Sequence, residues 1–168
     1  MELMTVMVVI LILAVMVLQV TGSINDKAYR ANCASNLRSL YAATSSYLQD
    51  HQEWPQIRES PNSKEYAQQW LAALSKYGIV ERNWLCPSVQ RQMKNSQPLT
   101  GTDFRADYFA TPFNNKPSTP YRWSTQPWFV ERGNVHGDGN LMIFASGQVK
   151  SLKETIRDMQ GRSFEYEP

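Results

Sequence analysis

The chain has 168 residues, of which 42% are hydrophobic, and a formal net charge of +2. This length predicts one domain and an N-terminal anchor segment, with enough chain after the anchor to bury a modest core. A net charge so close to zero creates no strong field, so bulk charge gives no sign of a nucleic-acid partner or of an acidic surface.

The first 20 residues are an apolar stretch headed by one acid. Glu2 opens it, and no polar residue interrupts it from Val6 to Leu18. About 20 apolar residues in a helix cross a hydrocarbon core, and a run that is apolar on every side does not suit the surface of a soluble domain. We therefore expect residues 1–22 to form a transmembrane or filament-core helix. A cleaved secretory signal is disfavoured, because no Lys or Arg precedes the run.

The next stretch is predicted to continue this helix in amphipathic form. Residues 23–52 contain neither Pro nor Gly. Apolar side chains recur there at helical spacing, and the residue before a proline disfavours a helix, so the helix should end before Trp54-Pro55. The buried stripe needs a partner, and a sheet is the natural one. The stripe consists of Leu37, Leu40, Tyr41, Thr44, Tyr47 and Leu48.

A second, shorter helix and a polar loop are predicted next. The spacing of apolar side chains from Tyr66 to Tyr77 indicates the helix, and Gly78 is placed to cap its C-terminal end. Residues 91–102 are polar and are expected to form a loop.

Three segments of the C-terminal half predict strands. Residues 108–110 and 128–130 are short aromatic runs between prolines, which suits the edges of a sheet better than its centre. Residues 140–152 predict a hairpin with a two-residue turn at Ser146-Gly147 and a first arm apolar enough to be buried on both faces. The charged tail from Lys153 onward is expected to be a short helix.

Together these elements predict an α+β fold, in which a long N-terminal helix packs on a small antiparallel sheet. Residues 23–168 form the globular domain, and residues 1–22 form the apolar helix before it. The five tryptophans are expected to fill the core rather than line a ligand groove, because each buries a large apolar area. They are Trp54, Trp70, Trp84, Trp123 and Trp128.

Two cysteines, Cys33 and Cys86, leave two interpretations open. Neither belongs to a Cys-x-x-Cys pair, so no zinc site is predicted. In an oxidising space outside the cytoplasm they can form a disulfide, and otherwise they are two separate buried thiols.

The Gly-rich segment from His136 through Asp138 to Asn140 also has two interpretations. His and Asp in one loop can bind a metal or transfer a proton, but one loop supplies at most two of the three or four ligands that a metal needs. A turn into the hairpin, with Gly at positive φ, is favoured. We therefore expect no metal and no cofactor.

The sequence contains no nucleophile elbow, phosphate loop, zinc-protease helix or dinucleotide fingerprint. A nucleophile pair of Cys33 or Cys86 with His136 requires that the fold bring them together, which nothing in the sequence predicts. We do not expect an enzyme.

Four segments carry a resemblance to a known family. Glu2-Leu-Met-Thr-Val, followed by an unbroken Val/Ile/Leu run, resembles the N-terminal helix of type IV pilins and type II secretion pseudopilins. The other three resemble a pilin-like subgroup, whose C-terminal signature is His-x9-Asp-Gly. They are Cys33-x-x-Asn36-Leu37, Cys86-Pro87, and His136 followed after nine residues by Ser146-Gly147. Ser146 stands where the signature has Asp, which removes a charge from the turn.

The resemblance implies a structural subunit, a minor pilin or pseudopilin, of a type IV pilus or a type II secretion filament. In the family, the acid at the position of Glu2 pairs with an N-terminal amine and sets the register between subunits. The implied partners are other pilin or pseudopilin subunits, an inner-membrane assembly platform and a prepilin peptidase. The implied location is the inner membrane, with a single span and a periplasmic or extracellular globular domain, before assembly into the filament.

The family's basic leader, which ends in Gly, does not precede Met1, so we expect the true start to lie upstream. The alternative function is a membrane-anchored extracytoplasmic domain that never polymerises. Such a domain would bind a polysaccharide or a protein through the Trp- and Tyr-rich loops between Asp107 and Arg132.

Overall fold

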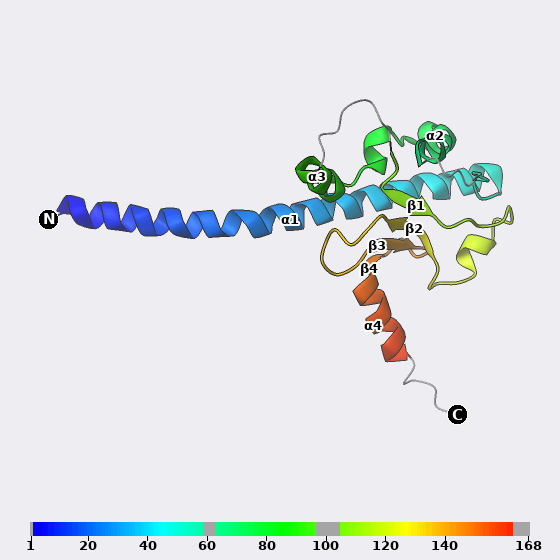
Figure 1. The fold of residues 1–168 in the computed structure, drawn as a ribbon. Helices are drawn as coiled ribbons and strands as arrows, with labels where there is room; N and C mark the ends of the chain where they lie inside the picture. The colour runs from blue at the N-terminus through cyan, green and yellow to red at the C-terminus, as the bar shows by residue number, and fades with distance from the viewer. Residues whose placement is uncertain (1, 59–62, 97–104, 163–168) are drawn as a thin grey trace.

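The computed structural model describes residues 2–58, 63–96 and 105–162; for residues 2, 16–24, 63, 94–96 and 162 it describes the backbone only. In these parts the chain has an α+β fold with one four-stranded antiparallel sheet, as predicted (Figure 1).

Helix α1 runs without a break from Glu2 to His51, so the predicted end before Trp54-Pro55 is confirmed. Gln52 follows with a φ of 57°, a left-handed conformation that ends a helix. The N-terminal half of α1 projects from the globular part, while its C-terminal half lies between the sheet on one side and two helices on the other (Figure 1).

Among the residues described, no helix is both long enough and apolar enough to cross a membrane. The prediction that residues 1–22 are helical is confirmed from Glu2 onward. The prediction that this helix spans a membrane receives no support.

Two helices cover the side of α1 that faces away from the sheet. Helix α2 spans Ser63–Leu74, and its last turn tightens into the 3-10 helix η1 at Ser75–Tyr77. Gly78 ends this helix with a φ of 83°, as predicted. After the 3-10 helix η2 at Glu81–Trp84, helix α3 spans Pro87–Ser96.

The predicted loop at 91–102 is therefore wrong up to Ser96, and its remainder lies outside the described residues. Pro87 opens α3 at the first helical position, where its fixed φ favours the helix and its missing N–H costs nothing. The polar composition of the segment suits an exposed helix as well as a loop, which is why it misled the prediction.

The sheet is a simple meander in the order β1-β2-β3-β4, with every neighbouring pair antiparallel. The short strand β1 lies at an edge, as predicted, whereas β2 is central, so its predicted edge position is wrong. Pro127 is the first residue of β2, and the other prolines of the region lie outside the strand, so none interrupts the ladder. The strands are β1 at Tyr108–Ala110, β2 at Pro127–Glu131, β3 at Leu141–Phe144 and β4 at Val149–Ser151, with the 3-10 helix η3 at Thr119–Tyr121 between β1 and β2.

The hairpin of β3 and β4 is confirmed, and all four residues of β3 are buried as predicted. Its loop has three residues, not two. The Gly147 N–H donates to the Phe144 carbonyl at 2.8 Å, and the Phe144 N–H donates to the Gln148 carbonyl at 3.1 Å. This pattern, with Gly147 at a φ of 75°, is a turn closed by a glycine bulge.

Helix α4, Leu152–Arg162, follows β4 directly and confirms the short C-terminal helix. Its N-terminus has a reciprocal cap. The Glu154 N–H donates to Ser151 Oγ at 3.2 Å, and the Ser151 N–H donates to Glu154 Oε2 at 2.7 Å.

The core lies between the stripe of α1 and the sheet and is rich in aromatic rings. The stripe is buried at Leu37, Leu40, Thr44 and Leu48, while Tyr41 and Tyr47 are partly buried. The core prediction is confirmed for four tryptophans but is wrong for Trp123, whose exposed fraction is 47%. The four buried ones are Trp54, Trp70, Trp84 and Trp128.

Candidate functional site

The centre of the site is a disulfide between Cys33 and Cys86, whose Cα atoms lie 5.3 Å apart. Cys33 lies on the buried side of α1, and Cys86 lies immediately before α3. Neither side chain is exposed. The structure therefore decides between the two interpretations of the cysteines in favour of the bridge, which ties the middle of α1 to the far end of a long intervening segment.

Hydrogen bonds also hold the Cys86 segment, one to α1 and another to the segment that precedes β1. The Asn36 side-chain amide donates to the Leu85 carbonyl at 2.9 Å. The Cys86 N–H donates to Asp107 Oδ2 at 2.8 Å, and Arg105 Nε donates to Asp107 Oδ1 at 2.6 Å. Cys33 and Asn36 lie about one helical turn apart on α1. Cys33 is bonded to Cys86, and Asn36 contacts the preceding residue, Leu85.

His136 lies beside this disulfide and is paired with an acid that the sequence analysis did not single out. His136 Nε2 lies 3.2 Å from Glu131 Oε1, and the exposed fractions of the two side chains are 3% and 0%. Glu131 Oε2 accepts the Leu141 N–H at 3.4 Å. Glu131 closes a strand whose other residues are mostly apolar; a charged residue in such a run was the only signal that could have revealed it.

The fold brings four side chains with metal-binding or nucleophilic atoms into one buried cluster. The donor atoms of Cys33, Cys86, Glu131 and His136 all lie within 4.8 Å of one another. We call this group the Cys–Glu–His cluster. It brings Cys86 to His136, which the sequence did not predict, but in the disulfide neither sulfur is a thiolate and neither can act as a nucleophile.

Tyr108 packs over the cluster from β1, opposite Glu131 in the ladder. Its hydroxyl lies 3.5 Å from the Cys33 carbonyl. Burial raises the pKa of the Tyr108 phenol well above its usual range, the Asn36 hydrogen bond opposes this shift, and the charge of Glu131 adds to it. Tyr108 therefore stays neutral beside the cluster.

The loop that carries His136, residues 132–140, is held by hydrogen bonds within the loop and by an ion pair with α1. Asn134 Oδ1 accepts the N–H groups of Gly137 and Gly139, each at 3.0 Å. Asp138 forms an ion pair with Arg30 of α1. Gly137 and Gly139 both have positive φ, so the predicted turn is confirmed for the glycines. His136 itself has more than a turn role, because its ring is buried against Glu131.

Ser146 and Gly147, the other end of the His-x9 signature, lie away from this cluster. A Cβ added to Gly147 would meet the ring of Tyr41 at 3.3 Å. Tyr41 follows Cys33 by eight residues on α1, which corresponds to about 12 Å along the helix. The signature therefore marks two separate contacts with α1 and not one site.

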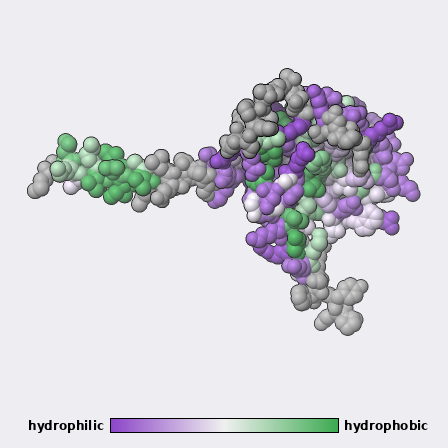
Figure 2. Space-filling model, viewed as in Figure 1, coloured by the Kyte–Doolittle hydropathy of each residue, from purple (hydrophilic) through white to green (hydrophobic). Residues whose placement is uncertain are grey.

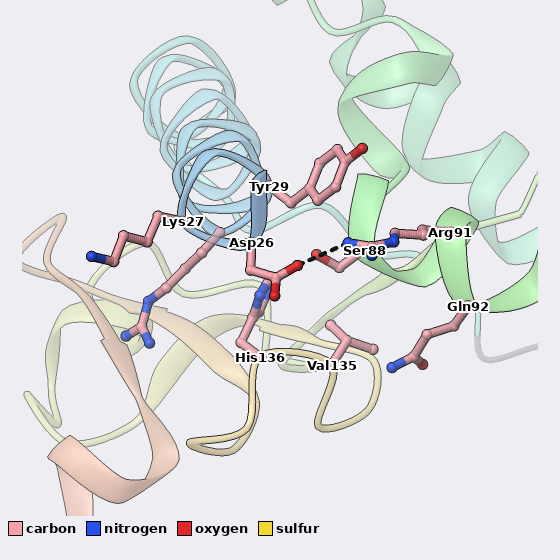
Figure 3. Close-up of a pocket in the computed structure, with 9 residues that line it drawn as sticks. Asp26, Lys27, Tyr29, Ser88, Arg91, Gln92, Val135 and His136 are labelled. Carbon is pink, nitrogen blue, oxygen red and sulfur yellow. Dashed lines mark hydrogen bonds and ion pairs between the residues drawn. The ribbon is translucent and has the colours of Figure 1, made fainter. Parts of the chain in front are cut away.

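A pocket with a cavity volume of about 450 Å³ lies between α1, α3 and the histidine loop (Figure 3). His136 lines it, and Arg91 of α3 donates to Asp26 of α1 across it at 2.8 Å. Lys27 and Arg30 also line this pocket. Of the Cys–Glu–His cluster, only His136 is among the residues that line this pocket.

The second candidate surface is the projecting half of α1. The large apolar side chains from Leu3 to Val15 have exposed fractions of 51–81%. Figure 2 shows them as a hydrophobic rod that stands apart from the globular part. The side chain of Glu2, the predicted register residue, lies outside the described residues.

Comparison of the chain with protein-family models, with curated proteins and with solved structures finds no match.

Proposed function

We propose that this chain is a structural subunit, a minor pilin or pseudopilin, of a type IV pilus or a type II secretion-type filament. The observation that carries the proposal is the division of α1 into two halves. One half is packed into the globular domain, and the other exposes every described large apolar side chain from Leu3 to Val15.

An exposed apolar surface of this size needs a partner. Soluble monomers rarely expose large contiguous apolar patches, and such patches mark protein or membrane contacts. The apolar side chains from Leu3 to Val15 surround the helix on all sides. A bundle of identical helices can cover all of these sides at once, whereas a single groove on one partner covers one side only.

Under the proposal the rod sits at the inner membrane before assembly, with the globular domain in the periplasm. It then moves among sister rods, which replace the lipid contacts with side-chain packing.

Glu2 is proposed to set the register of this bundle. A carboxylate among apolar helices is costly unless it is paired, so it favours the one axial position in which an N-terminal amine of a neighbour meets it. The assembly platform of the inner membrane and a prepilin peptidase are the further proposed partners.

Cross-linking tests the bundle directly. Val9→Cys and Ile12→Cys place a thiol on the rod, and Gln68→Cys places a matched thiol on the exposed face of α2. In cells that produce the full chain, a short bis-maleimide should convert each rod variant into covalent dimers. The double variant Val9→Cys/Ile12→Cys, with two thiols per chain, should give a ladder of larger species. The native cysteines stay silent because they are bonded and buried. Only monomers from both single rod variants, or dimers formed equally well by Gln68→Cys, would refute the bundle.

A second experiment tests the register. Glu2→Ala should remove most of the chain from the filament fraction sheared off the cells, while the Cys33–Cys86 bond still forms. Glu81→Ala, which removes an exposed acid of η2, is the matched control and should leave the filament fraction unchanged. Normal assembly of Glu2→Ala would exclude the proposed role of this residue.

One observation favours the alternative, a binding domain that does not polymerise. Tyr121 and Trp123 are both exposed beside η3, and the guanidinium of Arg122 lies 5.0 Å from the centre of the Trp123 ring. Exposed aromatic rings of this kind stack on sugars or on protein side chains. Trp123→Ala should weaken binding to immobilised cell-wall polysaccharide if this alternative holds, and should leave the cross-linked ladders intact if the filament proposal holds.

A further inference from the structure

We propose that the Cys–Glu–His cluster is a zinc site in the dithiol form of the protein, so that a disulfide and a Zn²⁺ ion are alternative cross-links at the same place. The four ligands would be Cys33, Cys86, Glu131 and His136. This inference does not depend on the filament proposal, because it concerns only the interior of the globular domain.

The donor set and its spacing fit zinc. Two thiolates, an imidazole and a carboxylate are all established zinc ligands, and four of them complete a tetrahedral structural site. Around a zinc ion such ligand atoms lie about 3.3–3.8 Å apart, given the usual bond lengths. Here they already lie within 4.8 Å of one another in the disulfide form. Closure around an ion therefore requires shifts of about 1 Å, within the reach of side-chain rotation.

The ligands are held by four different parts of the fold. Cys33 comes from α1, Cys86 from the segment before α3, Glu131 from the end of β2 and His136 from the loop after it. A site built on a helix and a strand is preorganised. Hydrogen bonds from surrounding residues hold two of the ligands, as they do in metal sites. Asp107 accepts the Cys86 N–H, and Glu131 Oε2 accepts the Leu141 N–H.

The charges also favour a cation in the dithiol form. Glu131 is fully buried, and a buried carboxylate is costly unless it is paired. Two thiolates and this carboxylate carry three negative charges, of which Zn²⁺ neutralises two. Sulfur and nitrogen donors in a tetrahedral arrangement select zinc over calcium and magnesium, which prefer oxygen donors.

The two forms interconvert by balanced chemistry. A dithiol reductant gives two electrons and two protons to the Cys33–Cys86 disulfide and itself becomes a disulfide. Zn²⁺ then displaces the two thiol protons to solvent and binds the thiolates. A disulfide oxidant reverses the sequence, because formation of the S–S bond consumes both thiolates and releases the ion. The pocket between α1, α3 and the histidine loop adjoins the cluster at His136 (Figure 3).

The test uses the full chain, purified in mild detergent and divided into an oxidised and a fully reduced, metal-free sample. Each is titrated with Co²⁺, whose thiolate charge-transfer and tetrahedral absorption bands report the ligands, and then with Zn²⁺. We expect one equivalent of Co²⁺ to bind the reduced sample only, and one equivalent of Zn²⁺ to displace it. Zn²⁺ should also protect both thiols from alkylation, as measured by mass.

Matched variants separate the cluster from nonspecific binding. His136→Gln and Glu131→Gln each remove one ligand and should weaken binding to the reduced chain by more than about 10-fold. His51→Gln changes the other histidine of the chain, which is exposed on α1 outside the cluster, and should bind as the wild type does.

Several results would overturn the proposal. One is a reduced chain that keeps its near-ultraviolet circular dichroism and binds no Co²⁺. Another is equal binding by the oxidised and reduced samples, and a third is binding that neither His136→Gln nor Glu131→Gln weakens. If reduction unfolds the chain, Zn²⁺ should restore the near-ultraviolet spectrum, and a failure to restore it would be equally decisive.

Discussion

Asp107 accepts the backbone N–H of Cys86 at 2.8 Å, so the residue that forms the covalent cross-link is itself held in place by a buried carboxylate. Asp107 is fully buried, and Arg105 compensates its charge from an almost buried position. Cys86 is therefore fixed from two sides, by the sulfur of Cys33 and by the oxygen of Asp107.

This arrangement predicts that Asp107→Ala destabilises the fold by about 3 kcal/mol, because it leaves a partly buried guanidinium and a buried N–H without their acceptor. The measurement is urea unfolding of the oxidised full chain in detergent. Asp50→Ala, which removes an exposed acid at the end of α1, is the control and should move the midpoint far less. Equal midpoints for Asp107→Ala and the wild type would contradict the prediction.

The disulfide should contribute strongly to stability. It closes a loop with a sequence separation of 53 residues, for which the chain-entropy model gives about 4 kcal/mol. Reduction in the presence of a chelator should lower the free energy of unfolding by this amount. The double variant Cys33→Ser/Cys86→Ser should start from the lower stability and show no response to the reductant. A response equal to that of the wild type would show that the reductant acts elsewhere.

Tyr108 should make the fold sensitive to alkali. Its pKa is raised by burial, so above about pH 10 the unfolded chain loses this proton while the folded chain keeps it. The contribution of Tyr108 to the free energy of unfolding is therefore constant below that pH. Above it, this contribution falls by about 1.4 kcal/mol per pH unit. Urea unfolding at increasing pH should show a shallower decline for Tyr108→Phe. Parallel declines would assign the sensitivity to other groups.

Gly139 is predicted to be irreplaceable for two reasons. Its φ is +94°, and an added Cβ would lie 2.6 Å from Leu152 Cβ. Gly139→Ala should therefore destabilise the fold by more than about 1 kcal/mol. Gly161 in α4 meets nothing within 4 Å, and Gly161→Ala should be neutral or stabilising by up to about 1 kcal/mol. Thermal unfolding of the two variants side by side measures the difference, and the same loss in both would refute the steric reason.

The spacing of apolar side chains along the sequence accounts for the parts of the fold that could be predicted. The stripe of α1 and the apolar arm at Leu141–Phe144 follow local patterns that their burial confirms. The central position of β2 could not be predicted, because strand order depends on pairing between distant segments. Helix α3 was missed because its polar residues lack a long stripe, so that only Pro87 marked its start.

The Cys–Glu–His cluster also depends on contacts between distant segments, which the sequence could not predict. His136 and the two cysteines stood out in the sequence, but nothing local showed that they meet. Glu131 was not singled out, because an acid at the end of a strand most often faces water. Its burial is a product of the sheet register, which places it opposite Tyr108.

The continuity of α1 has a mechanical consequence. Since α1 is one continuous helix from Glu2 to His51, a shift of its N-terminal tip along or around the helix axis carries the sheet with it. A slip of one helical turn at the tip displaces the whole domain by about 5.4 Å and keeps nearly the same face outward. In any assembly built on this helix, the contacts between the N-terminal parts of α1 therefore determine the spacing of the globular domains.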